Sequence, residues 1–191
     1  MAVRQRRPVT RKPAPGRLGL VAEFVNTLDV EVGHDALCDP PSLAMWLSGK
    51  GLLAEAARPV TDRDVGEAIA LREGLRSLLA ANNGIGQAAV AALNVGSGDL
   101  SLRVVFGEDR GATLHAKGDG VRAALAELIG IVFTAMTDGT WSRLKVCRED
   151  SCRWAYYDRS KNRSGAWCSM EVCGNRAKAR AYRARGAGET A

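Results

Sequence analysis

The sequence lacks an apolar run long enough to cross a bilayer, which takes about 20 consecutive apolar residues. The longest apolar stretch, residues 125–136, is interrupted by Glu127 and flanked by Asp119 and Asp138. The basic N-terminus is not followed by an apolar segment, so it does not resemble a secretory signal. We therefore expect no membrane partner and, as the default, a cytoplasmic location.

Histidine is also scarce, with two residues in 191. Neither His34 nor His115 lies near a cysteine or a carboxylate at the spacing of a metal site or a catalytic triad. Cys38 stands apart from the other cysteines, which makes it a poor candidate for a catalytic nucleophile. Since no acid, base and nucleophile converge in the sequence, we do not expect an enzyme.

Charge divides the chain into three parts. Residues 1–17 carry a net charge of +6, residues 18–140 carry −7, and residues 141–191 carry +7. An acidic body between two basic ends indicates that one part binds a polyanion and another part does something else. The first segment has several prolines and no apolar period, so we expect a basic disordered arm, which either touches phosphate or is simply an unstructured terminus.

Residues 18–140 have the pattern of a helical domain with one β-hairpin. Thr61 and Asp64 form the pattern of a capping box at the start of the longest helix, and Ser42 is expected to cap a shorter one. Asn82, Asn83 and Gly84 should end the long helix. Periodicity predicts helices over residues 18–28, 42–47, 61–81, 87–94 and 119–138, and strands over residues 100–106 and 113–115.

Two polar residues interrupt the apolar face of the first helix. Asn26 and Asp29 lie near Trp46 in this interpretation, and together they could contact a small-molecule ligand. The alternative is that Asn26 merely caps or ends the helix.

Four of the five cysteines lie in the last quarter of the chain and form two pairs. Four residues separate the members of each pair, Cys147 with Cys152 and Cys168 with Cys173, and fifteen residues lie between the pairs. Two close pairs can supply the four thiolates of a tetrahedral Zn²⁺ site. A redox site needs a tighter Cys-x-x-Cys motif, and disulfides do not suit a reducing compartment. We expect one structural zinc ion, with no coordination position left for a substrate.

The segment between the two cysteine pairs predicts a strand over residues 153–158 and a basic turn over residues 159–165. Trp154, Tyr156 and Trp167 could form the small apolar core of a zinc module, or they could stack on bases. A helix should follow Cys173 and end before Gly186, with Arg176, Arg180 and Arg183 on one face. Because nearly all its charges are positive, we prefer nucleic-acid binding in a major groove to a solvated surface helix.

The run Cys173-Gly174-Asn175-Arg176, together with both cysteine pairs and residues 157–163, resembles the CGNR zinc finger family. Residues from about 18, beginning with Phe24 to Asp29, resemble the ABATE domain that precedes this finger in bacterial stress-induced transcription regulators. One departure is Gly165-Ala166, where related fingers often have further arginines. The resemblance implies zinc ligation by the four cysteines, binding of double-stranded DNA by the finger, and a sensory role for the preceding domain. The expected DNA contacts are Lys161, Asn162, Arg163, Asn175, Arg176, Lys178, Arg180, Arg183 and Arg185.

These observations predict an α+β chain that regulates transcription. We expect a disordered arm (residues 1–17), a mainly helical domain with a hairpin that senses a ligand or mediates self-association (18–140), a treble-clef-like finger ending in a basic helix (141–186) and a short tail (187–191). One short helix contacts few base pairs, which favours a homodimer, although no heptad marks one. An RNA-binding or ribosome-associated protein is the alternative, and an enzyme with its site in residues 18–140 is the third.

Overall fold

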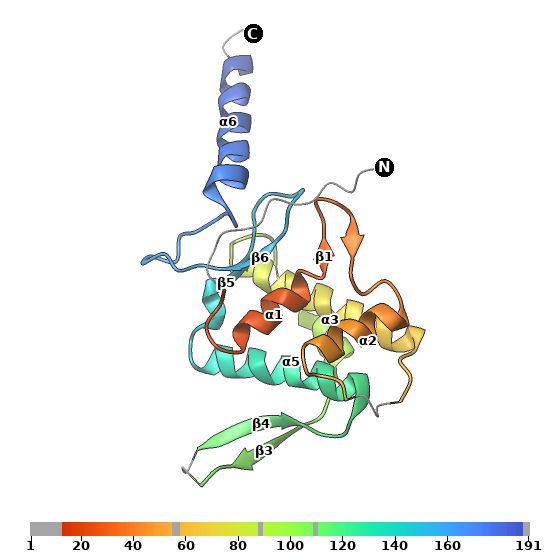
Figure 1. Cartoon of the computed structure of the whole chain (residues 1–191). Coiled ribbons are helices and arrows are strands. Elements are labelled where there is room, and N and C mark those ends of the chain that lie inside the picture. The colour runs from red at the N-terminus through yellow and green to blue at the C-terminus, as the bar shows by residue number, and fades with distance from the viewer. Residues whose placement is uncertain (1–12, 55–57, 88–89, 109–110, 189–191) are drawn as a thin grey trace.

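The computed structural model describes residues 13–54, 58–87, 90–108 and 111–188 (Figure 1). Three separate two-stranded antiparallel sheets accompany the helices, which confirms the predicted α+β class. Most of the predicted basic arm lies outside the described residues. The helices are α1 (Leu18–Val25), α2 (Pro40–Gly49), α3 (Asp62–Ala81), α4 (Val90–Ser97), α5 (Gly120–Thr137) and α6 (Asn175–Gly188), and the strand pairs are β1 (Leu28–Asp29) with β2 (His34–Asp35), β3 (Leu102–Phe106) with β4 (Ala112–Ala116), and β5 (Leu144–Val146) with β6 (Ala155–Tyr157).

The long helix α3 begins at the predicted capping box. The hydroxyl of Thr61 accepts a hydrogen bond from the N–H of Asp64, and the carboxylate of Asp64 accepts one from the N–H of Thr61. Arg58 donates two further hydrogen bonds to that carboxylate, which lowers the pKa of Asp64 to about 2 against the cost of its burial. The cap therefore carries a fixed negative charge at the positive end of the helix dipole.

The predicted boundaries of the first two helices are wrong. Helix α1 ends at Val25, before the predicted end at residue 28. The hydroxyl of Thr27 donates a hydrogen bond to the carbonyl of Phe24, and strand β1 begins at Leu28. Helix α2 is capped by Asp39, whose carboxylate accepts a hydrogen bond from the N–H of Ser42, and not by Ser42 itself. Two prolines then occupy the first helical positions, where a missing N–H costs nothing.

One hydrophobic core runs through the helical domain and into the C-terminal segment. The apolar faces of α1, α3 and α5 bury Phe24, Leu75 and Leu128 completely. Leu144 and Val146 of β5 and Ala155 and Tyr157 of β6 belong to the same core. One face of the β5–β6 sheet therefore packs into the body that the helices form.

Helix α5 is the one described helix that is long and apolar enough, by length and composition, to cross a membrane. Half of it is buried within the protein, against α1, α3 and the β3–β4 hairpin. A helix in the core of a protein also meets these criteria of length and composition. The packing of α5 therefore explains its apolar character in part.

Two asparagines at the end of α3 bind the backbone of the C-terminal segment. The side-chain amide of Asn82 donates hydrogen bonds to the carbonyls of Trp141 and Leu144, at 3.0 and 2.9 Å. The amide of Asn83, which is buried, donates to the carbonyls of Val146 and Ala166, at 2.7 and 3.0 Å. These two side chains, predicted only to end the helix, therefore also fix the position of β5 and of the loop before Cys168.

Replacing Asn83 by Ala should leave the buried carbonyl of Val146 without its side-chain donor, while the carbonyl of Ala166 would keep the N–H of Arg148. We expect Asn83→Ala to lower the free energy of unfolding by about 1–3 kcal/mol, measured by urea denaturation of the zinc-loaded chain. Asn94→Ala is the matched control, because Asn94 is exposed on α4. Equal stability of the two variants would contradict the role assigned to Asn83.

Candidate metal centre and basic helix

The four cysteines of the two predicted pairs meet at one buried site. Cys147 follows β5, Cys152 precedes β6, and Cys168 and Cys173 flank the start of a π-helical turn (Met170–Gly174) that leads into α6. Their four sulfur atoms all lie within 4.8 Å of one another. The Sγ of Cys168 lies 3.5 Å from that of Cys152 and 3.8 Å from that of Cys173, and no disulfide joins any of these four described cysteines.

These distances fit a zinc ion. Four sulfurs at the usual Zn–S distance of about 2.3 Å form a tetrahedron with edges of roughly 3.8 Å. Burial raises the pKa of Cys173 to about 12, and negative charge on Cys147 and Cys152 adds to the increase. A divalent cation offsets this repulsion and allows all four groups to be thiolates. The cysteines therefore form a site able to hold one structural zinc ion.

A second, smaller apolar cluster surrounds the sulfurs. Tyr156 is buried in it, and Trp154 and Trp167 pack against it. The expectation that at least two of these three aromatics form the core of the zinc module agrees with this packing, in which Tyr156 is buried and the two tryptophans are partly buried. Aromatic packing on several sides keeps water away from the thiolates, and four protein ligands leave no open coordination position, so the ion would stabilise the fold.

The metal site also determines where α6 begins. The hydroxyl of Ser169 accepts a hydrogen bond from the N–H of Val172, and this caps the π-helical turn that contains Cys173. The side chain of Asn175, the first residue of α6, donates a hydrogen bond to the carbonyl of Glu171. From there α6 extends away from the rest of the protein to Gly188, beyond the predicted end at Gly186 (Figure 1).

The basic turn, residues 159–165, folds around a buried ion pair that the sequence did not reveal. The ammonium of Lys145, on β5, lies 2.8 Å from the carboxylate of Asp158, and both side chains are almost inaccessible. Burial alone would raise the pKa of Asp158, but it is lowered, because Lys145 and the N–H groups of Ser160 and Gly165 donate to the carboxylate. Lys145 also donates to the carbonyl of Arg163, which fixes the far side of the turn.

Steric crowding by Asp158 explains why position 165 is a glycine. A Cβ atom at this position would lie 2.7 Å from Oδ1 of Asp158, closer than van der Waals contact allows. The arginine that related fingers often have in this region would therefore not fit beside Asp158 without a shift of the turn. Lys161, Asn162 and Arg163 remain exposed at its tip, as predicted for groups that contact DNA.

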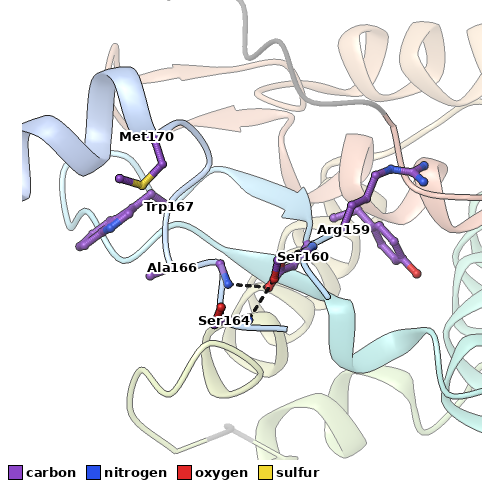
Figure 2. Close-up of a pocket in the computed structure, with 9 residues that line it drawn as sticks. Arg159, Ser160, Ser164, Ala166, Trp167 and Met170 are labelled. Atoms are coloured by element: carbon purple, nitrogen blue, oxygen red, sulfur yellow. Dashed lines mark hydrogen bonds between the residues drawn. The ribbon is translucent and has the colours of Figure 1, made fainter. Parts of the chain in front are cut away.

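A cavity of about 460 Å³ lies beside the basic turn (Figure 2). Trp167 and Met170 lie on one side of it, and Arg159, stacked on the ring of Tyr157, lies on the other. Several of its polar groups are already engaged, since the N–H of Ser164 donates to the hydroxyl of Ser160 and Asp158 binds Lys145. The cavity is therefore largely an apolar surface with one basic side chain, Arg159, at its edge.

The predicted face of α6 exists, but two of its three arginines contact acidic groups of the protein. Arg176 forms an ion pair of 2.8 Å with Glu31, in the turn between β1 and β2. Arg180 forms one of 2.8 Å with Glu149, a buried residue between Cys147 and Cys152. Arg176 and Arg180 thus anchor the helix, in addition to any contact with DNA.

The remaining cations of α6 face solvent. Lys178, Arg183 and Arg185 are exposed and form no ion pair with any described residue. Lys178 and Arg185 lie on the side of the helix opposite to Arg176, at 100° per residue. Tyr182, also exposed, lies near them. The helix therefore presents positive charge outward while its first two arginines hold its base.

The three residues predicted to contact a ligand have separate contacts in the described part of the chain. The amide of Asn26 donates to the carbonyl of Ala155 at 2.9 Å and accepts from its N–H at 2.7 Å, so it replaces a neighbouring strand beside β6. Trp46 packs on Phe24, with ring centroids 5.4 Å apart. Asp29 accepts a hydrogen bond from the N–H of Glu31. Asn26 lines a cavity of about 200 Å³ that neither Asp29 nor Trp46 lines. A ligand site shared by these three residues stays a prediction.

Sequence reasoning missed the residues that join α3 to the metal centre. Arg76 donates one hydrogen bond to the carbonyl of Arg153, next to Cys152, and another to the carbonyl of Val25 in α1. Arg148 donates to the carbonyl of Asn83. The only signal in the sequence was an arginine on the apolar face of a helix, and its partners lie too far along the chain to be inferred.

Matches to known families divide the chain between the helical domain and the segment that holds the four cysteines. A family model named ABATE and described as "Putative stress-induced transcription regulator" matches residues 18–139. A second model, described as "CGNR zinc finger", matches residues 143–186 and includes all four cysteines. The first match alone covers more than half of the chain. No curated protein matches the chain.

Removal of one metal ligand should release the ion. We expect native mass spectrometry to find one zinc ion per chain, and Cys168→Ser to lose it together with the circular dichroism signal of α6. Cys38→Ser is the matched control and should keep the ion, because Cys38 is exposed and remote from the site. A metal-free wild-type chain with intact α6 would refute the assignment.

Proposed function

The chain belongs to the ABATE family and carries a CGNR zinc finger, and from this premise we propose that it is a bacterial transcription regulator that binds double-stranded DNA. The observation that supports the proposal best is the arrangement of α6. Its length projects from the protein (Figure 1). Its base adjoins the turn that contains Cys173, and the exposed Lys178 and Arg185 make its outward side basic. Such a rod suits the major groove of B-DNA.

Two basic elements of the finger could act on one duplex. Lys178 and Arg185 would neutralise phosphates or contact guanine edges along the groove. Lys161 and Arg163, at the tip of the basic turn, would contact the phosphate backbone beside it. Because the turn is fixed by the Lys145–Asp158 ion pair and the helix by the metal, the two elements would keep a constant separation. Little conformational entropy would then be lost on binding.

The ABATE domain would sense a small-molecule ligand or mediate self-association. Hydrogen bonds between the ABATE domain and the finger support communication between the two. The side chains of Asn26, Arg76 and Asn83 donate them to backbone carbonyls around the metal site. The β1–β2 hairpin adds a route to α6 itself. Arg72, fully buried in α3, holds Asp35 of this hairpin at 2.6 Å, and the same hairpin presents Glu31 to Arg176. A movement of the hairpin would thus change the environment of a cation on α6.

An RNA-binding or ribosome-associated protein is the second candidate. The aromatic-lined cavity beside the basic turn and the exposed ring of Tyr182 would suit stacking on unpaired bases. Competition between duplex DNA and structured RNA separates the two candidates, because the deep, narrow major groove of A-form RNA excludes an α-helix.

We propose that the protein acts in the cytoplasm by binding DNA and that it is not an enzyme. His34 is exposed on β2, and the ring of His115 lies 3.0 Å from the hydroxyl of Thr113 on the exposed hairpin. Among the described residues, neither histidine belongs to a group of three or more side chains that could hold a metal ion. An enzyme with its site in the helical domain would require a set of titratable groups around a cavity.

Loss of outward charge on α6 should weaken duplex binding. We expect Lys178→Ala combined with Arg185→Ala to lower affinity by about tenfold or more at 0.15 M salt, and to reduce the slope of log K against log salt by about 2. Fluorescence anisotropy with a labelled duplex measures both. Arg63→Ala, a change at an exposed cation of α3, should alter neither quantity. An unchanged slope in the double variant would show that α6 does not contact the phosphates.

Arg176 gives a test of coupling between the two parts. Glu31→Gln removes the charge that holds Arg176, so we expect duplex affinity to rise by up to about fivefold, in line with an ion pair worth about 1 kcal/mol or less. Glu23→Gln, which breaks an exposed ion pair with Lys50 on the helical domain, should leave affinity unchanged. A fall in affinity for Glu31→Gln would mean that the ion pair positions α6 for DNA.

A further inference from the structure

The β3–β4 hairpin covers only part of α5. Leu102 and Leu114 pack on Gly130 of α5, where the absence of a side chain allows close approach. Strand β4 lies closer to α5 than β3 does, and the two strands continue past this contact toward the turn (Figure 1). By the period of two residues, Val104 and Phe106 share the face of β3 that carries Leu102.

Beyond that contact, apolar side chains are exposed on both elements. Phe106 is 79% exposed and Val104 55%, and on α5 Phe133 is 54% and Met136 46% exposed. Phe133 follows Gly130 by three residues, so it lies near the stripe of α5 that the hairpin begins to cover. We name these four residues the hairpin–α5 surface. The β3–β4 hairpin lies at the end of the protein opposite to α6 (Figure 1).

The hairpin–α5 surface is electrically neutral, unlike the rest of the helical domain. Residues 99–117 contain three acidic and three basic side chains, and residues 128–137 contain none of either sign, whereas residues 18–140 carry a net charge of −7. A second copy of the same acidic domain would be repelled at most other surfaces, but not at this one. An anionic lipid surface would be repelled by the domain as a whole.

The exposed apolar area matches what a dimer needs. With about 150–200 Å² per large apolar side chain, the four exposed fractions leave on the order of 400 Å² of apolar surface. A standard interface buries roughly 800 Å² per partner, of which about 65% is apolar in homodimers. The surface therefore supplies most of the apolar area that one partner contributes.

The outer strand also has a self-complementary pattern. No other strand in the described part of the chain pairs with the free edge of β3. Antiparallel pairing of two β3 strands about Val104 would place Leu102 opposite Phe106 of the second copy and Val104 opposite itself. The apolar face would then continue across a four-stranded sheet, and the exposed edge of each hairpin would be covered.

We propose that a second copy of this chain docks on the hairpin–α5 surface, with the two β3 strands paired about Val104. The inference rests on the self-association named in the proposed function and does not depend on DNA binding. Each α6 would remain free at the far end of its protomer, because the interface lies opposite to it. The dimer would present two basic helices to separate half-sites.

Sedimentation equilibrium of the zinc-loaded chain without DNA tests the interface. We expect a dimer at micromolar concentrations, and an increase of about tenfold or more in the dissociation constant for Phe106→Glu, which places a charge at the interface. Met45→Glu is the matched control, because Met45 is 73% exposed on α2, away from the hairpin, and its dimer should persist. A monomer at all concentrations, or a dimer unaffected by Phe106→Glu, would overturn the proposal.

Crosslinking tests the register. In the Cys38→Ser background, Val104→Cys should give a covalent dimer with a short bismaleimide, since residue 104 faces its own copy, and Met45→Cys should not. Absence of the crosslink in a chain that still dimerises would overturn the pairing of the β3 strands. Since neither experiment contains DNA, failure here is distinguishable from failure of the proposed DNA binding.

Discussion

The clustering of four buried thiols at one point is the constraint on which the rest of the C-terminal structure depends. Without a cation, burial and then the negative charge of the neighbouring thiolates raise the pKa of Cys173. With zinc, two loops that are separated along the chain become one rigid unit. Cys173 is both a ligand and part of the turn that begins α6, so the metal fixes the direction of the basic helix.

A second consequence is that the finger and the helical domain are not mechanically independent. β5 and β6 complete the core formed by α1, α3 and α5, and side-chain amides at both ends of the interface replace missing backbone partners. Asparagine suits this task because its amide donates and accepts in one plane, as a peptide group does. A change in the packing of the helical domain can therefore reach the metal site through rigid contacts. This arrangement suits a regulator in which binding at one part alters the other.

The sequence predicted the parts of this structure that depend on local pattern. The capping box at Thr61 and Asp64, the β3–β4 hairpin and the helix after Cys173 follow from periodicity and from residues close together in the chain. The zinc ligands could be predicted because two regular cysteine pairs in a reducing compartment are far more often metal ligands than disulfides. The family resemblance agreed with both family matches.

What could not be predicted depends on partners that are distant in sequence. From the sequence alone, Asn26 could contact a ligand or end a helix. Its actual partner, the backbone of Ala155, lies far along the chain. Arg176 and Arg180 have the pattern of free DNA-binding cations, and only the fold brings Glu31 and Glu149 to them. The Lys145–Asp158 pair is likewise invisible, because a charged residue in a strand usually faces solvent. Helical periodicity indicates which residues share a face of a helix. It does not indicate which residues elsewhere in the chain that face contacts.

The central claim is that the metal-fixed helix and the basic turn bind a DNA duplex. Hydrogen–deuterium exchange of the zinc-loaded chain, with and without duplex DNA, tests it most directly, because it reports where the duplex covers the protein. The account predicts slower exchange in residues 159–165 and in α6 when the duplex is present. Protection confined to the helical domain, with exchange in α6 unchanged, would contradict it.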